Sequence, residues 1–234
     1  MVLPAFLKSK NLKIHQSNLC SEIILPTSVE RTAVCCLSSV NLEYFDEWKK
    51  DDQFLADIAE MLDNVLTYFI THAPNAISRA KYSAERERSI GVGALGFHAY
   101  LQSKNIPWES AMAVSANTRM FMHIRNQLDK ANIKLGKERG EAPDAVGTGQ
   151  RFSHVMAIAP NASSSILMGN TSPSIEPFRA NVYRQDTLSG ASINKNKHLD
   201  KIIKKACEKN NKLDYNEIWS SIIMNDGSVQ HLDI

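Results

Sequence analysis

The chain has 234 residues, of which 43% are hydrophobic and 22% are charged, and its net charge is +2. These values are typical of a globular protein and exclude an extensively disordered or fibrous chain. The balance of 27 basic and 25 acidic side chains gives no electrostatic basis for contacting nucleic acid or a membrane surface, so any anionic partner must bind at a local site.

The first elements predicted along the chain are two short strands and a long helix. Residues 19–25 and 32–38 are apolar or β-branched runs, and Pro26 closes the first of them. Apolar residues then recur at helical spacing over 46–71, with Pro74 just beyond the end, which predicts an amphipathic helix.

The second half of the chain is predicted to contain one more strand and several helices. The glycine-rich residues 91–96 are interpreted as a turn that enters a helix at 97–101, and a second long helix is predicted over 108–137. The further elements predicted are a strand over 154–159, a helical run that begins at Ile166, and helices over 199–209 and 216–224. Strands separated by long helices indicate an α/β fold with some parallel pairing.

The sequence reveals neither a membrane-spanning segment nor a secretory signal. No apolar stretch approaches the roughly 20 residues that a membrane-spanning helix needs. The opening residues place the apolar side chains before the first lysines, which is the reverse of a secretory signal. We therefore expect a cytoplasmic protein that contacts no membrane.

The four cysteines, Cys20, Cys35, Cys36 and Cys207, include no Cys-x-x-Cys pair. This spacing is typical of neither a disulfide scaffold nor a zinc site. Side chains alternate along a strand, so Cys35 and Cys36 are not expected to line the same site. Two buried small hydrophobic residues remain the alternative for this pair, and Cys207 is assigned to helix packing. The seven histidines form no i, i+4 pair, so we expect this chain to bind no metal.

The segment 17–23 carries the densest set of reactive side chains. If it is extended, Asn18, Cys20 and Glu22 project from one face, which brings together an amide, a thiol and a carboxylate. Such a set could orient a substrate, react through sulfur and accept a proton. From composition alone, a structural strand whose polar face meets solvent is about as well supported.

A second candidate site follows Pro160. Ser163, Ser164 and Ser165 lie between an apolar strand and an apolar helical run. Free backbone N–H groups at such a helix start attract a phosphate. Capping of the helix by Ser163 or Ser164 is the alternative, and the two interpretations are compatible because both use the same donors.

Gly91, Gly93 and Gly96 match a G-x-G-x-x-G pattern. Residues 81–89 before it are charged rather than an apolar strand, and no βαβ unit frames it, so we do not expect a dinucleotide site. A dinucleotide-binding module here would require a nucleotide affinity that Gly93→Val removes.

Four motifs taken together resemble one known family. They are Asn18-x-Cys20-x-Glu22, then Cys35-x-Leu37-Ser38 fifteen positions after Cys20, then Pro160-x-Ala162-Ser163-Ser164-Ser165, and finally Ser174-Ile175-Glu176-Pro177. In this order they are similar to the catalytic barrel of the large subunit of class I ribonucleoside-diphosphate reductase, with bacteriophage versions nearest in character. The resemblance covers 13–234, whereas 1–12 looks unlike the family and is treated as a separate N-terminal segment.

The resemblance implies a fold and a set of roles. The fold would be part of a ten-stranded α/β barrel with a central finger loop, incomplete in this chain. Cys20 would become a transient thiyl radical that abstracts the 3′ hydrogen of a ribonucleotide. Glu22 would accept the 3′-hydroxyl proton, Asn18 would orient the substrate, and Cys35 would be one of two thiols that reduce the intermediate. The residues implied to contact the substrate are Ser17, Leu37, Pro160, Asn161, Ala162, Ser163, Ser164 and Ser165, of which 161–165 would hold the diphosphate.

The same resemblance implies partners. No cofactor is expected on this chain, since the radical would come from a di-metal small subunit, and thioredoxin or glutaredoxin would be the external reductant. The sequence lacks the family's second reducing cysteine, allosteric sites, radical-pathway tyrosines and cysteine tail. We therefore expect the chain to be inactive alone and to need a separate N-terminal part of the large subunit. The lack of the C-terminal features is equally compatible with a third, separate piece of the subunit and with a truncated sequence. A phage-encoded protein of this kind would work in the host cytoplasm.

Two other functions remain open at this point. A split gene could leave a non-catalytic remnant that only binds a partner, although Asn18, Cys20, Glu22 and Cys35 are all retained. A stand-alone thiol oxidoreductase would use Cys35 and Cys36, and the lack of a Cys-x-x-Cys pair argues against it.

Overall fold

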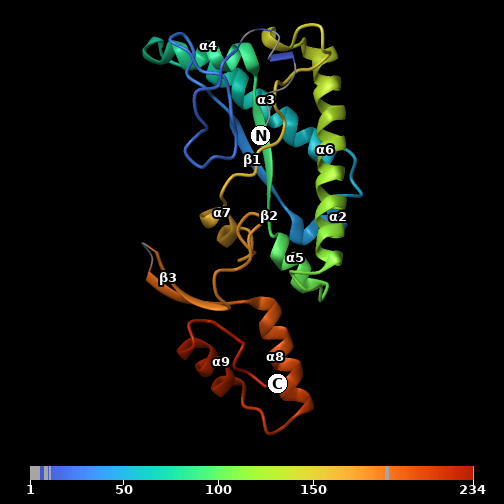
Figure 1. Cartoon of the computed structure of the whole chain (residues 1–234), viewed down its shortest axis with the longest axis vertical. Helices are drawn as coiled ribbons and strands as arrows, with labels where there is room; N and C mark the ends of the chain where they lie inside the picture. The colour runs from blue at the N-terminus through green and yellow to red at the C-terminus, as the bar shows by residue number, and fades with distance from the viewer. Residues whose placement is uncertain (1–5, 8–9, 11, 188–189, 234) are drawn as a thin grey trace.

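The computed structural model describes residues 6–7, 10, 12–187 and 190–233. Most of the segment 1–12 that was expected to differ from the family therefore lies outside the described residues. Figure 1 shows an elongated molecule in which a helical body is built on a strand pair and a smaller lobe follows at the C-terminal end.

Two parallel strands form the centre of the larger body. β1 (Cys36–Asn41) pairs with β2 (Ile90–Leu95) in a register that runs from Cys36 opposite Ile90 to Asn41 opposite Leu95. The connection between them passes through α2 (Phe45–Trp48), α3 (Phe54–His72) and α4 (Ser78–Glu87). The α/β class with parallel pairing is therefore confirmed, and the strand predicted over 32–38 begins later, at Cys36.

The interpretation of residues 91–96 as a turn is wrong for all but its last residue. All six residues of β2 are buried, and a Cβ atom on Gly93 would overlap the carbonyl oxygen of Ala157, so glycine is needed for close packing. Only Gly96, with φ of 81°, makes the turn into α5 (Phe97–Ser103). A βαβ unit does exist here, contrary to expectation, but Gly91 and Gly93 lie inside its second strand instead of forming a phosphate-binding loop after the first.

The strand predicted over 154–159 is also wrong, although this segment does run beside β2. The amides of Ile90 and Val92 donate to the carbonyl oxygens of His154 and Val155, at 3.1 and 2.9 Å. A regular parallel ladder would join residues two apart on both chains, whereas these acceptors are consecutive. The mismatch breaks the ladder, so the segment stays extended without becoming a strand.

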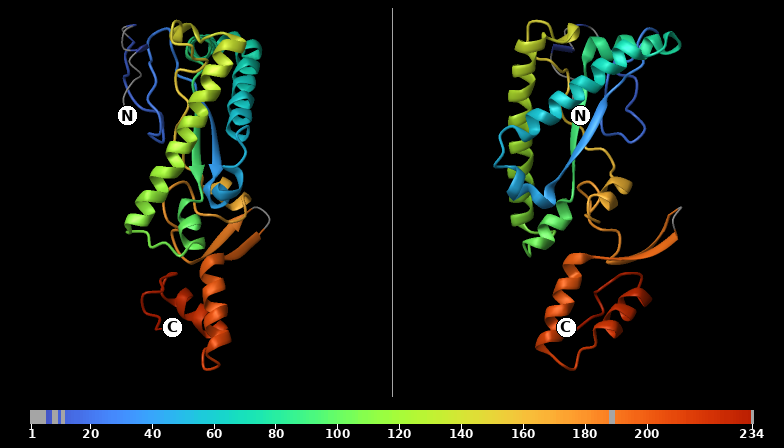
Figure 2. Two further views of the ribbon diagram at one scale, coloured as in Figure 1. Left: turned by 90° about the vertical axis from the view of Figure 1, so that its right-hand side faces the viewer. Right: turned by 180° about the vertical axis from the view of Figure 1, so that it is seen from behind.

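Two long helices cover the strand pair. α3 fills most of the range predicted over 46–71, and α6 (Ala111–Arg139) confirms the helix predicted over 108–137. α6 begins at the cap Ser110, whose hydroxyl accepts a hydrogen bond from the Ala113 amide at 3.1 Å. α3 packs against α6 and against both strands (Figure 2). The core between them includes Leu55, Leu62, Leu66, Val92, Met120, Ile124 and Leu128.

α4 was not predicted, because its few apolar residues give no clear helical pattern. Instead, charged contacts fix its C-terminal end: Glu87 pairs with Arg31 at 3.1 Å, and Arg86 pairs with Asp144. Arg31 also bonds Asp144 at 2.6 Å, so the segment before β1, α4 and the segment after α6 meet in one ion cluster. This cluster fixes the position of the chain that leads into β1.

The C-terminal lobe has a small core of its own. The antiparallel pair β3 (Val182–Thr187) and β4 (Gly190–Lys195) was not predicted, whereas α8 (Lys197–Lys209) and α9 (Tyr215–Met224) confirm the last two predicted helices. Figure 2 shows the lobe at the opposite end of the molecule from α4. Its core consists of Val182, Ile203, Ile218, Trp219 and Ile222. In the described part of the chain, every helix is too short or too polar to cross a membrane.

Candidate active site

Cys20 lies in a tight turn, so the strand predicted over 19–25 is wrong. The Ser21 amide donates to the carbonyl oxygen of Asn18 at 3.1 Å, and the Asn18 side-chain oxygen accepts from the Ile23 amide at 3.1 Å. Ser21 has φ of 60°, which a strand does not allow. Asparagine side chains favour such turns because they bond nearby backbone groups. Asn18, Cys20 and Glu22 therefore share a turn and not one extended face.

One cavity brings the Cys20 turn next to the start of the serine segment. Cys20 and Glu22 line it together with Pro160, although 140 residues separate Cys20 from Pro160 in the sequence. The remaining lining residues are Ser21, Met156, Ala157, Ile158, Ser174, Ile175 and Glu176. The Glu22 Oε2 atom is buried and has no hydrogen-bond partner among the described residues. A buried carboxylate oxygen without a partner can accept a proton or a hydrogen bond from a ligand.

A neighbouring cavity contains the other predicted site residues of this region. Ser17, Asn18, Cys35 and Leu37 line it, with Arg31, Arg79 and His15 among the charged or titratable residues around them. The structure therefore divides the predicted catalytic set: Cys20 and Glu22 face one cavity, and Asn18 and Cys35 face the next. Both cavities adjoin the same turn, residues 17–23.

The two adjacent cysteines have different surroundings. Burial raises the pKa of the Cys35 thiol to about 12, although a hydrogen bond from the Ser89 hydroxyl opposes this rise. Cys36 packs against the main hydrophobic core, and burial raises its pKa as well. A thiol oxidoreductase needs a thiolate near neutral pH, so these environments disfavour the stand-alone redox pair that the sequence left open.

The serine segment forms α7 (Ala162–Leu167), which starts earlier than the helical run predicted from Ile166. Asn161 is its N-cap and makes no side-chain capping bond, so capping by Ser163 or Ser164 is wrong. Instead, the Asn161 side-chain amide donates to the Ser39 hydroxyl and to the carbonyl oxygens of Ala94 and Ala159, at 3.1, 3.3 and 2.8 Å.

The serines of α7 point in different directions. Ser165 is buried and donates its hydroxyl to the Ala162 carbonyl at 2.9 Å, whereas Ala162, Ser163 and Ser164 are exposed. None of these residues lines the Cys20 cavity, which reaches only Pro160. The N–H groups of the first helical turn have no partner within the helix, so they remain donors for an anion. The helix α7 therefore begins two residues after Pro160 without forming the wall of the Cys20 cavity.

The loop after α7 is fixed to the end of β1 and to α8. The Asn41 side chain donates to the Met168 carbonyl at 3.5 Å, and the Lys197 ammonium bonds both the Gly169 carbonyl, at 3.2 Å, and Glu43, at 2.8 Å. His198 lies 3.2 Å from the same carboxylate. Glu43 thus joins β1, the loop after α7 and the C-terminal lobe.

Glu43→Gln is expected to destabilise the chain in a pH-dependent way. Burial raises the pKa of the Glu43 carboxyl, but His198 and Lys197 together hold it at about 2. The folded pKa lies below the ordinary value of 4.5, so this stabilisation is present above pH 4.5 and is lost as the pH falls toward 2. After discounting for solvent screening, the free energy of unfolding should fall by about 1–2 kcal/mol at pH 6.

Urea unfolding of both proteins between pH 2 and 7 measures this difference. Glu47→Gln, at an exposed position in α2, is the control and should give no such pH-dependent loss. A loss of equal size at pH 2 and pH 6 would contradict the assigned role of the carboxylate.

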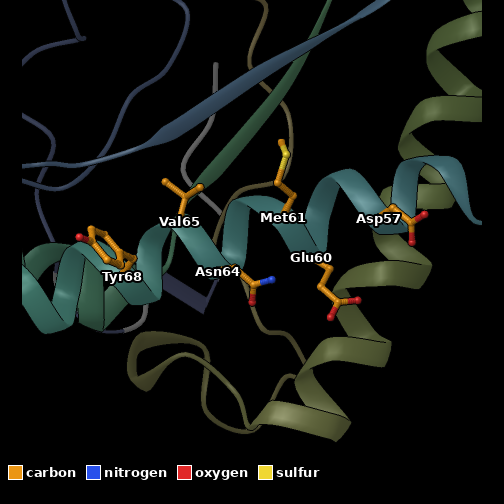
Figure 3. Close-up of a pocket in the computed structure, with 6 residues that line it drawn as sticks. All are labelled: Asp57, Glu60, Met61, Asn64, Val65 and Tyr68. Carbon is orange, nitrogen blue, oxygen red and sulfur yellow. The ribbon is translucent and has the colours of Figure 1, made fainter.

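A depression on α3 is separate from these cavities. Figure 3 shows that one helix supplies all of its labelled residues, with Met61 and Val65 on one side of the helix and Glu60 and Asn64 on the other. None of the predicted site residues lines this depression. Over the described residues, no three His, Cys, Asp or Glu side chains are grouped so as to hold a metal ion.

Sequence reasoning missed several residues of these cavities. Ser174, Ile175 and Glu176 line the Cys20 cavity, but their motif entered only as part of the family resemblance and was given no role. Ser89, which bonds Cys35 but lines neither cavity, was also missed, because a lone serine before a strand has no distinctive pattern. The position of residues 174–176 in the cavity and the bond from Ser89 to Cys35 both depend on contacts between segments that lie far apart in the sequence.

Comparisons with known proteins show the family to which the chain belongs. The family model described as "Ribonucleotide reductase, barrel domain" matches residues 5–148 and 142–233. The chain therefore belongs to the ribonucleotide reductase barrel-domain family, and it forms part of such a barrel.

Individual relatives show the same family over nearly the whole chain. Over 99% of the present chain, the sequence is 58% identical to the ribonucleoside-diphosphate reductase large subunit of Invertebrate iridescent virus 3. Over 97% of the present chain, it is 47% identical to the putative ribonucleoside-diphosphate reductase large subunit of Frog virus 3. The solved Actinobacillus ureae class Id ribonucleotide reductase alpha subunit matches 98% of the chain with a TM-score of 0.88 and 41% identity.

The chain spans 36% and 39% of those two viral relatives and 42% of the Actinobacillus chain. The relatives named here come from animal viruses and a bacterium, so the expected nearness to bacteriophage versions stays an expectation.

Proposed function

We propose that this chain is part of the catalytic subunit of a ribonucleoside-diphosphate reductase, which makes deoxyribonucleotides for DNA synthesis by thiyl-radical chemistry. One observation carries the proposal: Cys20, Glu22 and Pro160 line a single cavity, and the Glu22 Oε2 atom has no hydrogen-bond partner among the described residues. A hydrogen-abstracting sulfur and a proton acceptor must both reach the same ribose, and this cavity supplies both next to α7.

The proposed roles follow from the chemistry of each group. Cys20 abstracts the 3′ hydrogen, and Glu22 takes the 3′-hydroxyl proton. Asn18 orients the substrate through its side-chain NH₂, since its carbonyl oxygen is engaged by the Ile23 amide. The substrate contacts are Ser17, Leu37 and Pro160 together with the segment 161–165, whose helix N-terminus holds the diphosphate.

Reduction of the substrate is assigned to Cys35 and a second thiol outside this chain. The two thiols give up two electrons and two protons and form a disulfide, and the 2′-hydroxyl oxygen of the substrate leaves as water. Thioredoxin or glutaredoxin then reduces the disulfide. A di-metal small subunit supplies the radical to Cys20.

The strand pair supports a need for further polypeptide. In the described part of the chain, β1 hydrogen-bonds only to β2 as a strand, so its other edge is open. Leu37, on β1, is 41% exposed although it carries an apolar side chain. We propose that a separate N-terminal part of the large subunit pairs with this edge and that the assembly works in the cytoplasm.

Reconstitution tests the proposed function. The chain is co-expressed with a candidate N-terminal part and small subunit, and the complex is assayed for reduction of ribonucleoside diphosphates with thioredoxin. We expect turnover in the complex and none in the chain alone. Cys35→Ala should remove turnover, whereas Cys207→Ala, in the C-terminal lobe, should retain it. An assembled complex without turnover would favour a non-catalytic binding fragment and overturn the proposal.

A further inference from the structure

Ser89 occupies a fully buried position between α4 and β2, directly beside the Cys35 sulfur. Its side chain has 0% exposure. The Ser89 hydroxyl donates to the Cys35 Sγ atom at 3.7 Å, and the Ser89 carbonyl accepts from the Cys36 amide at 3.3 Å. The side chain of Ser89 therefore binds Cys35, and its backbone binds Cys36, the first residue of β1, which fixes the direction of the hydroxyl.

We propose that Ser89 is a positioning residue for Cys35, whose hydroxyl holds the sulfur in one orientation and stabilises its thiolate form. The inference rests on the proposed function for the role of Cys35, but the contact itself is independent of it. The neutral thiol also donates to the Cys36 carbonyl at 3.7 Å. Loss of the thiol proton removes that bond, whereas the bond from Ser89 becomes charge-assisted and stronger.

The surroundings of Cys35 make this donor important. Burial is the largest cause that raises the pKa of the thiol, and the nearby Cys36, Glu22 and Glu87 raise it further. Arg31, Arg79 and His15 line the adjoining cavity, but among the main causes that shift the pKa of the Cys35 thiol, the hydrogen bond from Ser89 is the one that lowers it. Without it, the main remaining influences on this thiol would all disfavour a buried negative sulfur.

The donor matters at one step of the proposed cycle. When a reducing dithiol attacks the disulfide at the partner sulfur, the new bond joins the attacking sulfur to that partner. The bond to Cys35 Sγ breaks, and its electron pair stays on Cys35 as a thiolate that is protonated afterwards. Such exchange is faster when the leaving thiolate is more stable. Ser89 would thus speed the release of Cys35.

The rate of Cys35 alkylation by iodoacetamide tests this role in the full 234-residue chain. The modified fraction is followed by mass spectrometry with fragment assignment between pH 7 and 9. Ser89→Ala should raise the thiol pKa by about one unit, because hydrogen bonds to charged groups are the strong ones. The thiolate of higher pKa is also more nucleophilic, so the net rate should fall about threefold at each pH.

Controls separate this effect from loosened packing. Ser83→Ala removes another buried hydroxyl, which has no hydrogen-bond partner among the described residues, and should leave the Cys35 rate unchanged. Cys36 and Cys207 act as internal references in the same samples. Ser89→Thr keeps a hydroxyl and should retain a rate near that of the unsubstituted chain.

The sign of the change decides the outcome. A purely structural role predicts faster alkylation in Ser89→Ala, because a loosened site admits the reagent. An equal or faster rate in a variant that stays folded by circular dichroism overturns the inference. If Ser89→Ala does not fold, a slower rate in Ser89→Thr than in the unsubstituted chain overturns it. The assay needs no substrate or partner, so its failure leaves the proposed function standing, and failed reconstitution leaves this inference standing.

Discussion

Replacing Asp63 by alanine is expected to lower the free energy of unfolding by about 3–5 kcal/mol, because it leaves buried positive charge without its partner. Asp63 on α3 has 0% exposure. Its carboxylate accepts hydrogen bonds from Arg88 at 2.8 Å, from Arg139 at 2.9 Å and from Arg151 at 3.0 Å. These arginines come from the end of α4, the end of α6 and the segment before residue 154, so one carboxylate joins three parts of the fold.

Urea unfolding measures the effect, with Asp129→Ala as the matched control. Asp129 pairs with Arg125 at 2.7 Å, but their side chains are 46% and 59% exposed. An exposed pair of this kind contributes less than about 1 kcal/mol. Similar losses in the two variants would contradict the role assigned to burial. If the Asp63→Ala chain does not fold at all, Asp63→Asn keeps an acceptor and should show a smaller loss.

Cys20→Ala is expected to reduce the turnover of the reconstituted complex to less than about a thousandth, as loss of an essential reacting group commonly does. Cys20 is exposed in its turn and belongs to no hydrophobic cluster of the described residues, so the substitution should not disturb folding. Cys36→Ala is the matched control, because Cys36 packs against the core and takes no part in the proposed chemistry.

The two proposed thiols can be distinguished by the reaction step at which each substitution stops turnover. Tritium release from a substrate labelled at the 3′ carbon reports hydrogen abstraction. Cys20→Ala should abolish this release, whereas Cys35→Ala should retain it and fail only at the later reduction. Release of tritium by Cys20→Ala would show that another group abstracts the hydrogen, and the assignment of Cys20 would fall.

The helices were predictable because their signal is local. In α3 and α6 the apolar side chains recur with the period of a helix, and Pro107 and Gly140 flank the helix predicted over 108–137. β2 was not predictable in this way. Its glycines exist because Ala157 passes beside them, and nothing within residues 90–95 reveals that contact. α4 was missed for a similar reason, since its partners Arg31 and Asp144 lie far away in the sequence.

Candidate site residues could be chosen from the sequence, but the arrangement expected for them was wrong. Asn18, Cys20 and Glu22 stood out by type and spacing, yet alternation along a strand gave the wrong geometry. The Asn18 side chain closes a turn by binding the Ile23 amide, a competing local bond that composition does not reveal. Likewise, the meeting of Cys20 with Glu176 in one cavity depends on how the whole chain folds.

The three hydrogen bonds of Asn161 have a thermodynamic consequence. They join the start of α7 to Ser39 in β1, Ala94 in β2 and the neighbouring Ala159. The backbone at this helix end is thus held in place without a ligand. If an anion binds there as proposed, it would restrict little additional motion of the chain. Little of the favourable interaction free energy would then be lost to ordering the binding site.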